Sequence, residues 1–180
     1  MDDTPSDITR PVSASSVERA LDAERFERWA RKLPEVHEGA AVIVNDELYW
    51  TPLVKPLAES TMAIVSSFGV HERDDEAFDL LDPEGDLSIR FIPGTIDATT
   101  LAASHGHVDT TSANTDINVA FPIDRLRELV DEGRIGRVAD THYGIMGWCP
   151  RVERMRDEVA PQIIERLRTE AVDAVLLVPG

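Results

Sequence analysis

The sequence predicts an α/β fold: an open, mostly parallel sheet flanked by helices in a Rossmann-like three-layer arrangement. With 180 residues, 42% hydrophobic and 29% charged, the chain suits a globular domain with a sizeable core. Short apolar runs rich in β-branched residues alternate with segments of helical spacing, and this order implies right-handed crossovers between parallel strands. We expect residues 1–13 to form a flexible acidic tail and residues 14–180 a single α/β domain.

The first expected elements are a helix and a short strand. Ser15 and Glu18 have the spacing of a capping box, which predicts that a helix begins there and ends at Pro34. Apolar residues recur on one side of this helix, namely Val17, Leu21, Phe26, Trp29 and Leu33. The apolar run 40–44 predicts a strand.

Three further strands are expected in the middle of the chain. The run 62–65 predicts a strand that leads into a small-residue turn and His71, and open α/β sheets place ligand-handling groups beyond the carboxyl end of such strands. The segments 88–92 and 116–121 also predict strands.

The last third of the chain predicts two helical regions and a closing strand. Pro122 starts an amphipathic helix that ends at Gly133 and Gly136. Apolar residues keep helical spacing over 151–170, where Pro161 either kinks the helix or starts a second one. Residues 172–178 predict a buried strand, and an α/β chain normally turns into another helix after such a strand. The sequence stops at Gly180 instead, so we expect a sheet truncated after its last strand.

Charge and cysteine content limit the classes of function. The formal net charge of −16 argues against binding to nucleic acid or to an anionic membrane surface. Sixteen of the 18 basic residues are arginines, which is typical either of a salt-adapted acidic proteome or of an ordinary acidic protein. One cysteine excludes an internal disulfide, and no signal peptide or membrane span is recognisable, so we expect a cytoplasmic protein.

One histidine motif could bind a metal. His105, His107 and Asp109 alternate, so on an extended segment all three side chains would face one way and could hold a divalent ion. A polar edge strand with ordered hydrogen bonds explains the same spacing. A proton-shuttling or substrate-binding role is a third interpretation.

Other candidate residues lie in a glycine-containing stretch. His142 and Tyr143 precede Gly144 and Gly147, which fits either a site loop or a buried aromatic corner, and His71 has the same two interpretations. Cys149 lacks a nearby basic cluster or helix N-terminus, so we interpret it as structural. The chain has no P-loop, no dinucleotide-binding glycine motif and no nucleophile elbow.

Several stretches together resemble the glycine/sarcosine/betaine reductase selenoprotein B family, which includes the related D-proline reductase subunit. The motifs are G-V-H at 69–71, H-x-H-x-D-T at 105–110, D-I-N-x-x-F-P at 116–122 and H-Y-G-x-M-G at 142–147. Their order and spacing also match, and the likeness is strongest over residues 50–180.

The resemblance implies an oxidoreductase that cleaves a C–N bond of a small amine or amino acid, with a dithiol/disulfide couple supplying the electrons. It implies a cysteine or selenocysteine nucleophile just after Gly180, partner reductase subunits and a thioredoxin-like dithiol donor. A UGA codon for selenocysteine, taken as a stop, would explain the ending. The resemblance also implies a substrate pocket lined by His71, His105, His107, Asp109, His142 and Tyr143.

Two alternatives belong to other classes of function. One is a non-catalytic domain that binds a partner subunit or small molecule and has lost its redox half. The other is a metal-dependent enzyme that uses His105, His107 and Asp109. Because a truncated sheet exposes the apolar flank of its last strand, we also expect an oligomer.

Overall fold

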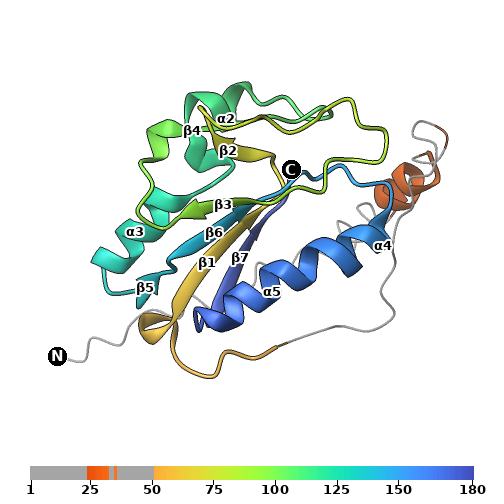
Figure 1. Cartoon of the computed structure of the whole chain (residues 1–180). Coiled ribbons are helices and arrows are strands. Elements are labelled where there is room, and N and C mark those ends of the chain that lie inside the picture. Colours follow the sequence, from red (N-terminus) through yellow and green to blue (C-terminus); the bar gives the residue numbers. More distant parts are fainter. Residues whose placement is uncertain (1–23, 33–34, 36–50) are drawn as a thin grey trace. The chain divides into compact units, whose positions relative to one another are not determined.

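The computed structural model describes residues 24–32, 35 and 51–180, and the chain divides into two units, residues 1–46 and 47–180 (Figure 1). In the first unit residues 24–32 are helical, and the rings of Phe26 and Trp29 lie 5.8 Å apart. This helix lies within the one predicted from the capping box to Pro34. The capping box itself and the strand predicted at 40–44 lie outside the described residues, so the single domain over 14–180 stays a prediction.

The second unit is built on a five-stranded, mostly parallel sheet (Figure 1). Its strands are β1 (Thr61–Ser66), β3 (Arg90–Pro93), β5 (Arg137–Val138), β6 (Thr141–Gly144) and β7 (Ala174–Val178). The central strand β1 pairs in parallel with β7 along one edge and with β5 and β6 along the other. β3 runs antiparallel to β6. The predicted α/β class and mostly parallel sheet are therefore confirmed.

A two-stranded antiparallel sheet and several helices complete this unit. Strands β2 (Val70–Glu72) and β4 (Leu101–Ala103) form the small sheet. The α-helices are α2 (Thr111–Thr115), α3 (Ile123–Asp131), α4 (Val152–Arg154) and α5 (Ala160–Thr169). The other helical turns are η1 (Leu57–Glu59), η2 (Ala98–Thr100), η3 (Ile117–Val119) and η4 (Met155–Val159). No helix in the described part of the chain is long and apolar enough to cross a membrane.

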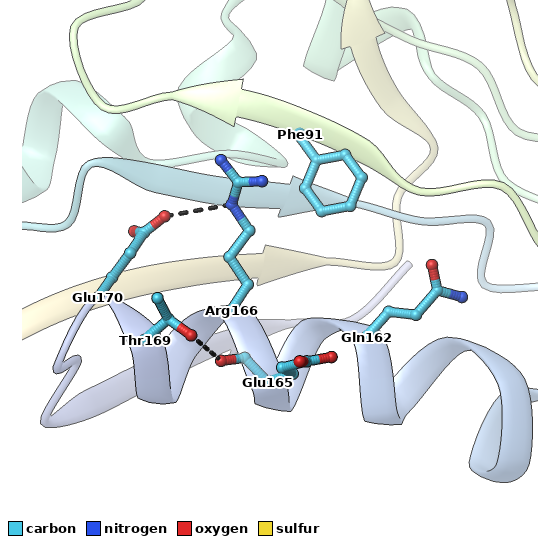
Figure 2. A pocket seen from close by; sticks show the side chains of 6 residues that line it. All are labelled: Phe91, Gln162, Glu165, Arg166, Thr169 and Glu170. Atoms are coloured by element: carbon cyan, nitrogen blue, oxygen red, sulfur yellow. Dashed lines mark hydrogen bonds and ion pairs between the residues drawn. The ribbon is translucent and has the colours of Figure 1, made fainter.

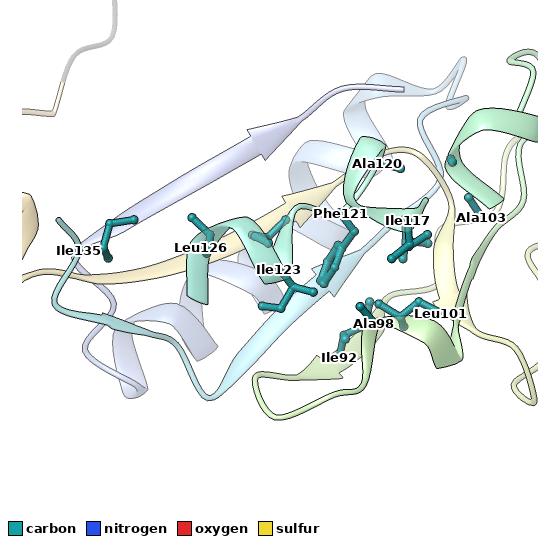
Figure 3. Packing of buried hydrophobic residues seen from close by; sticks show 13 residues of the cluster. Ile92, Ala98, Leu101, Ala103, Ile117, Ala120, Phe121, Ile123, Leu126 and Ile135 are labelled. Atoms are coloured by element: carbon teal, nitrogen blue, oxygen red, sulfur yellow. The ribbon is translucent and has the colours of Figure 1, made fainter. Parts of the chain in front are cut away.

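Alternate residues of the sheet strands belong to two different hydrophobic clusters, one on each face. Ile64 of β1 belongs to a cluster that includes Leu101 of the small sheet, Ile117 of η3 and Leu126 of α3 (Figure 3). Tyr143 of β6 belongs to a second cluster with Val159, Ile163 and the partly buried Val65. The period-2 alternation of a strand accounts for this division between the two faces. The Rossmann-like three-layer assignment stays a prediction, because the sheet is curled and has an antiparallel edge strand.

Of the predicted strands, the one at 116–121 is wrong and the one at 88–92 is only partly right. Within the predicted strand 116–121, residues Ile117–Val119 form the 3₁₀ turn η3 instead, because the carboxylate of Asp116 accepts hydrogen bonds from the backbone and side chain of Asn118. The strand predicted at 88–92 is present as β3 but runs antiparallel.

The C-terminal elements also differ in detail from the prediction. The helical region over 151–170 is interrupted by the π-helical turn η4, directly before Pro161 in the first turn of α5. Because proline has no N–H to donate, it cannot continue the regular α-helical ladder there. The strand predicted at 172–178 is present as β7, but it is not fully buried. The described residues leave one face of β7 uncovered, and the side chain of Leu177 on that face is 71% exposed.

His142 is part of the sheet's hydrogen bonding. Its Nδ1 accepts a hydrogen bond of 2.9 Å from the backbone N–H of Ile64, and its ring packs edge-on against Phe121. The ring is fully buried, and burial lowers the pKa of His142 to about 4, with the positive charge of Arg127 adding to the effect. The neutral imidazole therefore belongs to the folded state.

We expect the free energy of unfolding to fall as the pH is lowered from about 6.5 to about 4. In that window the unfolded chain binds a proton at His142 and the folded chain does not, which costs roughly 3 kcal/mol in total. His142→Asn should remove this contribution, since an amide oxygen can accept the Ile64 N–H but does not titrate. Urea unfolding of both proteins across this pH range measures the difference, and parallel pH profiles would contradict the assignment.

Gly144 lets the small sheet approach β6. A Cβ at Gly144 would overlap the backbone carbonyl oxygen of Val70, whereas a Cβ at Gly106 would meet only the oxygen and Cβ of Leu80 at 3.7 and 3.9 Å. We expect Gly144→Ala to lower the free energy of unfolding by about 2 kcal/mol or more, and Gly106→Ala to change it by less than about 0.5 kcal/mol. Equal urea midpoints for the two variants would contradict this expectation and would show that the backbone moves to make room for the methyl group at position 144.

Candidate functional site

The carboxyl ends of three parallel strands meet at one edge of the sheet. The backbone N–H of Ser67, just after β1, donates to the carbonyl of Val178 at the end of β7 at 2.9 Å. The N–H of Ile145, just after β6, donates to the carbonyl of Ser66 at the same distance. Beyond β7, the N–H of Gly180 donates to the side-chain oxygen of Ser67 at 3.0 Å. These bonds hold the three loops that follow β1, β6 and β7 together.

The strand order gives this edge the position at which open α/β sheets bind ligands. The chain leaves β1, passes through the small sheet and α3, and returns as β5 and β6 on one side of β1. It then leaves β6 through α4 and α5 and returns as β7 on the other side (Figure 1). In open α/β sheets, ligands bind outside the carboxyl ends of strands whose connections diverge in this way.

His105 lies at this carboxyl edge. Its Nδ1 accepts a hydrogen bond of 3.1 Å from the backbone N–H of His107, and its Nε2 is buried without a hydrogen-bond partner in the described residues. Nε2 lies 3.2 Å from the position that a Cβ on Gly147 would occupy, and the carbonyl oxygens of Ser67 and Gly180 lie 2.7 and 3.0 Å from that same position. Burial lowers the pKa of His105, and the nearby ring of His107 adds to the shift.

Aromatic rings line the loops around His105. The ring of His107 lies 4.4 Å from that of Trp148, and the ring of Phe68 lies 6.2 Å from that of His105. Phe68 follows β1 and forms an isolated bridge with Met146 after β6. The edge therefore combines the imidazoles of His105 and His107 with the aromatic rings of Phe68 and Trp148.

His105, His107 and Asp109, which were predicted to bind a metal, do not lie on one face of an extended segment. Residues 106–108 form a bend rather than an extended segment, so the shared face is absent. Asp109 is exposed, and its carboxylate accepts hydrogen bonds from the backbone and side chain of Thr111 at the start of α2. Among the described residues, no three His, Cys, Asp or Glu side chains form a group that could hold a metal ion.

His71 lies in the small sheet and is buried. One ring nitrogen, Nδ1, lies 2.7 Å from the backbone carbonyl of Glu72, so it carries the proton and donates. The other, Nε2, lies 2.9 Å from the hydroxyl of Ser104 and accepts its hydrogen bond. Both ring nitrogens are thus satisfied, and the ring holds β2 to the residue that follows β4.

His142 and Tyr143 lie within β6 rather than in a loop, and their side chains point to opposite faces of the sheet. Both are fully buried. Burial raises the pKa of the Tyr143 hydroxyl to about 12, with Glu170 adding to the shift. The His142 ring packs against Phe121 and the Tyr143 ring against Phe91, so both belong to the core on either face of the sheet.

Cys149 has the environment of a structural cysteine. Its thiol donates a hydrogen bond of 3.2 Å to the backbone carbonyl of Arg151. Burial raises the pKa of the thiol, which opposes formation of a thiolate nucleophile.

Sequence reasoning missed Ser67 and Ser104. Ser67 follows β1 and fixes Gly180, and Ser104 directly precedes His105 and bonds His71. A small polar residue after the predicted strand 62–65 was the available signal for Ser67, whereas no strand was predicted before Ser104, so that position carried no signal. Their bonding partners lie more than 30 residues away in the sequence, however, so the contacts themselves could not be read from a local pattern.

A separate pocket of about 440 Å³ lies between β3 and α5 (Figure 2). Its lining is mostly polar and charged: Phe91, Gln162, Glu165, Arg166, Thr169 and Glu170. Arg166 already pairs with Glu170 at 3.2 Å and lies over the ring of Phe91. None of the residues predicted from the sequence lines this pocket, and we place the candidate site at the carboxyl edge of the sheet because the strand ends converge there.

Comparisons with known proteins point to one family. The model of the family described as glycine/sarcosine/betaine reductase selenoprotein B matches residues 38–179. A D-proline reductase subunit gamma from Acetoanaerobium sticklandii is 41% identical over 131 residues, which cover 73% of this chain and 53% of that protein. A glycine reductase complex component B subunit gamma from Symbiobacterium thermophilum is 33% identical over 130 residues, which cover 70% of this chain and 30% of that protein.

A more distant relative, a betaine reductase complex component B subunit beta from Peptoclostridium acidaminophilum, is 26% identical over 93% of this chain and 37% of its own length. No solved structure matches the chain. The chain spans about half the length of the D-proline reductase subunit and less of the others. Because the family model matches residues 38–179, which are most of the sequence, this chain belongs to the glycine/sarcosine/betaine reductase selenoprotein B family.

Proposed function

We propose that this chain forms part of a reductase subunit that cleaves a C–N bond of a small amine or amino acid. The main support is the convergence of three strand ends at Gly180, next to His105, in a chain that belongs to this reductase family. The resemblance implies that the reactive residue follows the strand that corresponds to β7, so we place the nucleophile, a cysteine or selenocysteine, beyond residue 180.

The proposed reaction consumes one dithiol for each C–N bond. A thiolate or selenolate attacks the carbon that bears the nitrogen, the C–N bond breaks, and the amine leaves with a proton. A thiol then attacks the chalcogen, and the carbon takes up a proton as its bond to the chalcogen breaks. The second thiol closes a disulfide and restores the nucleophile. Two electrons pass from the dithiol to the substrate, and its two protons end on carbon and nitrogen.

The proposed assembly includes further subunits and an electron donor. The relatives are named as subunits of reductases, two of them as components of glycine and betaine reductase complexes. We therefore propose partner reductase subunits and a thioredoxin-like dithiol donor. Of the six residues predicted to line the pocket, we propose that His105 and His107 lie near the substrate, while His71, Asp109, His142 and Tyr143 support the fold.

We expect the nucleotide sequence after codon 180 to continue in frame with a cysteine or UGA codon close to Gly180. The gene product that includes this continuation, assembled with its partner subunits, should convert D-proline to 5-aminovalerate with one dithiol oxidised per turnover. D-proline is the first substrate to test, because identity to its reductase is 41%, compared with 33% for a glycine reductase subunit. Product and free thiol are measured together.

A pair of substitutions separates the roles of the cysteines. Replacement of the proposed nucleophile by serine should abolish turnover, and Cys149→Ser should leave it unchanged, since the Cys149 thiol bonds Arg151 and is not activated. A different stop codon with no coding continuation would overturn the proposal and favour a non-catalytic partner-binding domain.

A further inference from the structure

Side-chain contacts hold a long loop between β2 and β3 against the fold (Figure 1). Residues 73–89 contain no helix or strand, and loops of this length without secondary structure are uncommon and usually functional. Phe78 of the loop is buried, and the guanidinium carbon of Arg90 lies 4.5 Å from the centre of its ring. Arg90 also donates hydrogen bonds to the Ser88 hydroxyl and the Glu76 carbonyl, at 2.8 and 2.9 Å. One side chain at the start of β3 therefore anchors the loop at several points.

Aspartate side chains fix the turns inside this loop. The carboxylate of Asp79 accepts a hydrogen bond of 2.9 Å from the backbone N–H of Leu81. That of Asp82 accepts one of 2.8 Å from the backbone N–H of Glu84. The Glu84 carboxylate in turn pairs with Arg154 of α4 at 3.7 Å. Because the turns are already formed in the free chain, binding through this loop costs little ordering entropy.

The loop exposes two adjacent leucines within a strongly acidic segment. Leu81 is 91% exposed and Leu80 is 46% exposed. Residues 73–86 contain seven acidic side chains and one basic side chain, so they carry −6 of the chain's formal charge of −16. A single exposed apolar side chain is ordinary, but these two are adjacent, lie on fixed turns and have carboxylates around them. Two copies of this surface would repel each other, so the charge favours a different partner with a basic surface.

The acidic loop adjoins the candidate site. A Cβ on Gly106, the residue between His105 and His107, would lie 3.7 Å from the carbonyl oxygen of Leu80 and 3.9 Å from its Cβ. Leu80 also lines the same small hollow as His107 and Trp148. A protein that binds the loop would therefore lie beside the carboxyl edge of the sheet.

We propose that residues 73–86 form a docking surface for a partner reductase subunit, with Leu80 and Leu81 entering an apolar pocket that Lys and Arg side chains surround. This inference rests on the proposed function, which includes partner subunits, and names the surface that one of them contacts. Burial of the leucines supplies affinity. The carboxylates speed the encounter with a basic surface and disfavour acidic ones.

Leu81→Ser tests the apolar contact, because a side chain that is 91% exposed contributes little to folding. The probe is the set of purified partner subunits that restores C–N cleavage when mixed with the gene product that contains this chain. We expect the Kd for these subunits to rise about tenfold, as expected for loss of a buried leucine. Val54→Ser is the matched control: Val54 is 99% exposed and lies outside the loop, so this variant should keep the wild-type Kd.

An unchanged Kd for Leu81→Ser would overturn the inference and leave the proposed function in place. If no partner subunit restores cleavage with the wild-type protein, the proposed function fails, and the inference fails with it. Sedimentation equilibrium of the wild-type chain and of Leu81→Ser should give the same mass. A dimer that Leu81→Ser dissociates would show that a second copy covers the loop and would overturn its assignment to a partner subunit.

Two pairs of substitutions test the charges. The double variant Asp79→Asn, Asp82→Asn keeps both turns, because an amide oxygen accepts the same backbone N–H, and it removes two negative charges. We expect slower association with the partner subunits and a smaller change in rate between about 50 and about 300 mM NaCl. Asp97→Asn, Asp116→Asn alters two similar turns outside the loop and should behave like the wild type. Equal effects of the two double variants would show that total charge matters and would overturn the role of this loop.

Discussion

The pairing of β1 on both of its edges is the constraint on which the second unit depends. β7 pairs along one edge of β1 from Met62 to Ser66, and β5 and β6 pair along the other. Between β5 and β6 the ladder is interrupted, and the His142 ring accepts the Ile64 N–H in place of a backbone carbonyl. Because a buried N–H without a partner is costly, this ring lets the strand that faces β1 bend without leaving a donor of β1 unsatisfied.

The bend has consequences on both faces of the sheet. Because of this bend, β6 pairs with the end of β1. Gly144 has no side chain there, so the backbone carbonyl of Val70 packs against it and the small sheet lies close to β6. On the other face, Thr141 at the start of β6 bonds the Glu170 carboxylate just after α5 through both its N–H and its hydroxyl, at 3.0 and 2.6 Å. The same strand therefore fixes the position of the small sheet and of the helix that leads to β7. Both contacts help to bring the loops after β1, β6 and β7 to one edge.

Local pattern was enough to predict β1, α3, the helical region that contains α5, and the presence of β7. It failed where side chains bond the backbone. Asp116 and His105 each accept a hydrogen bond from the backbone N–H two residues ahead, and these bonds accompany a 3₁₀ turn and a bend where extended segments were expected. The motifs also grouped six residues into one pocket, but whether a residue lies at the carboxyl edge or inside a strand depends on register and pairing, which no local pattern contains.

His105 and His142 show why the position in the fold, and not the residue type, separates a site residue from a core residue. In each, Nδ1 accepts a backbone N–H and Nε2 is buried without a partner in the described part of the chain, so the two neutral rings have the same tautomer. The His142 ring lies inside the sheet against Phe121, where no ligand can reach it. The His105 ring lies where three strands end, beside a glycine whose missing side chain leaves Nε2 close to Gly180. The same local hydrogen bonding thus stabilises a strand in one place and orders a loop at the end of the sheet in the other.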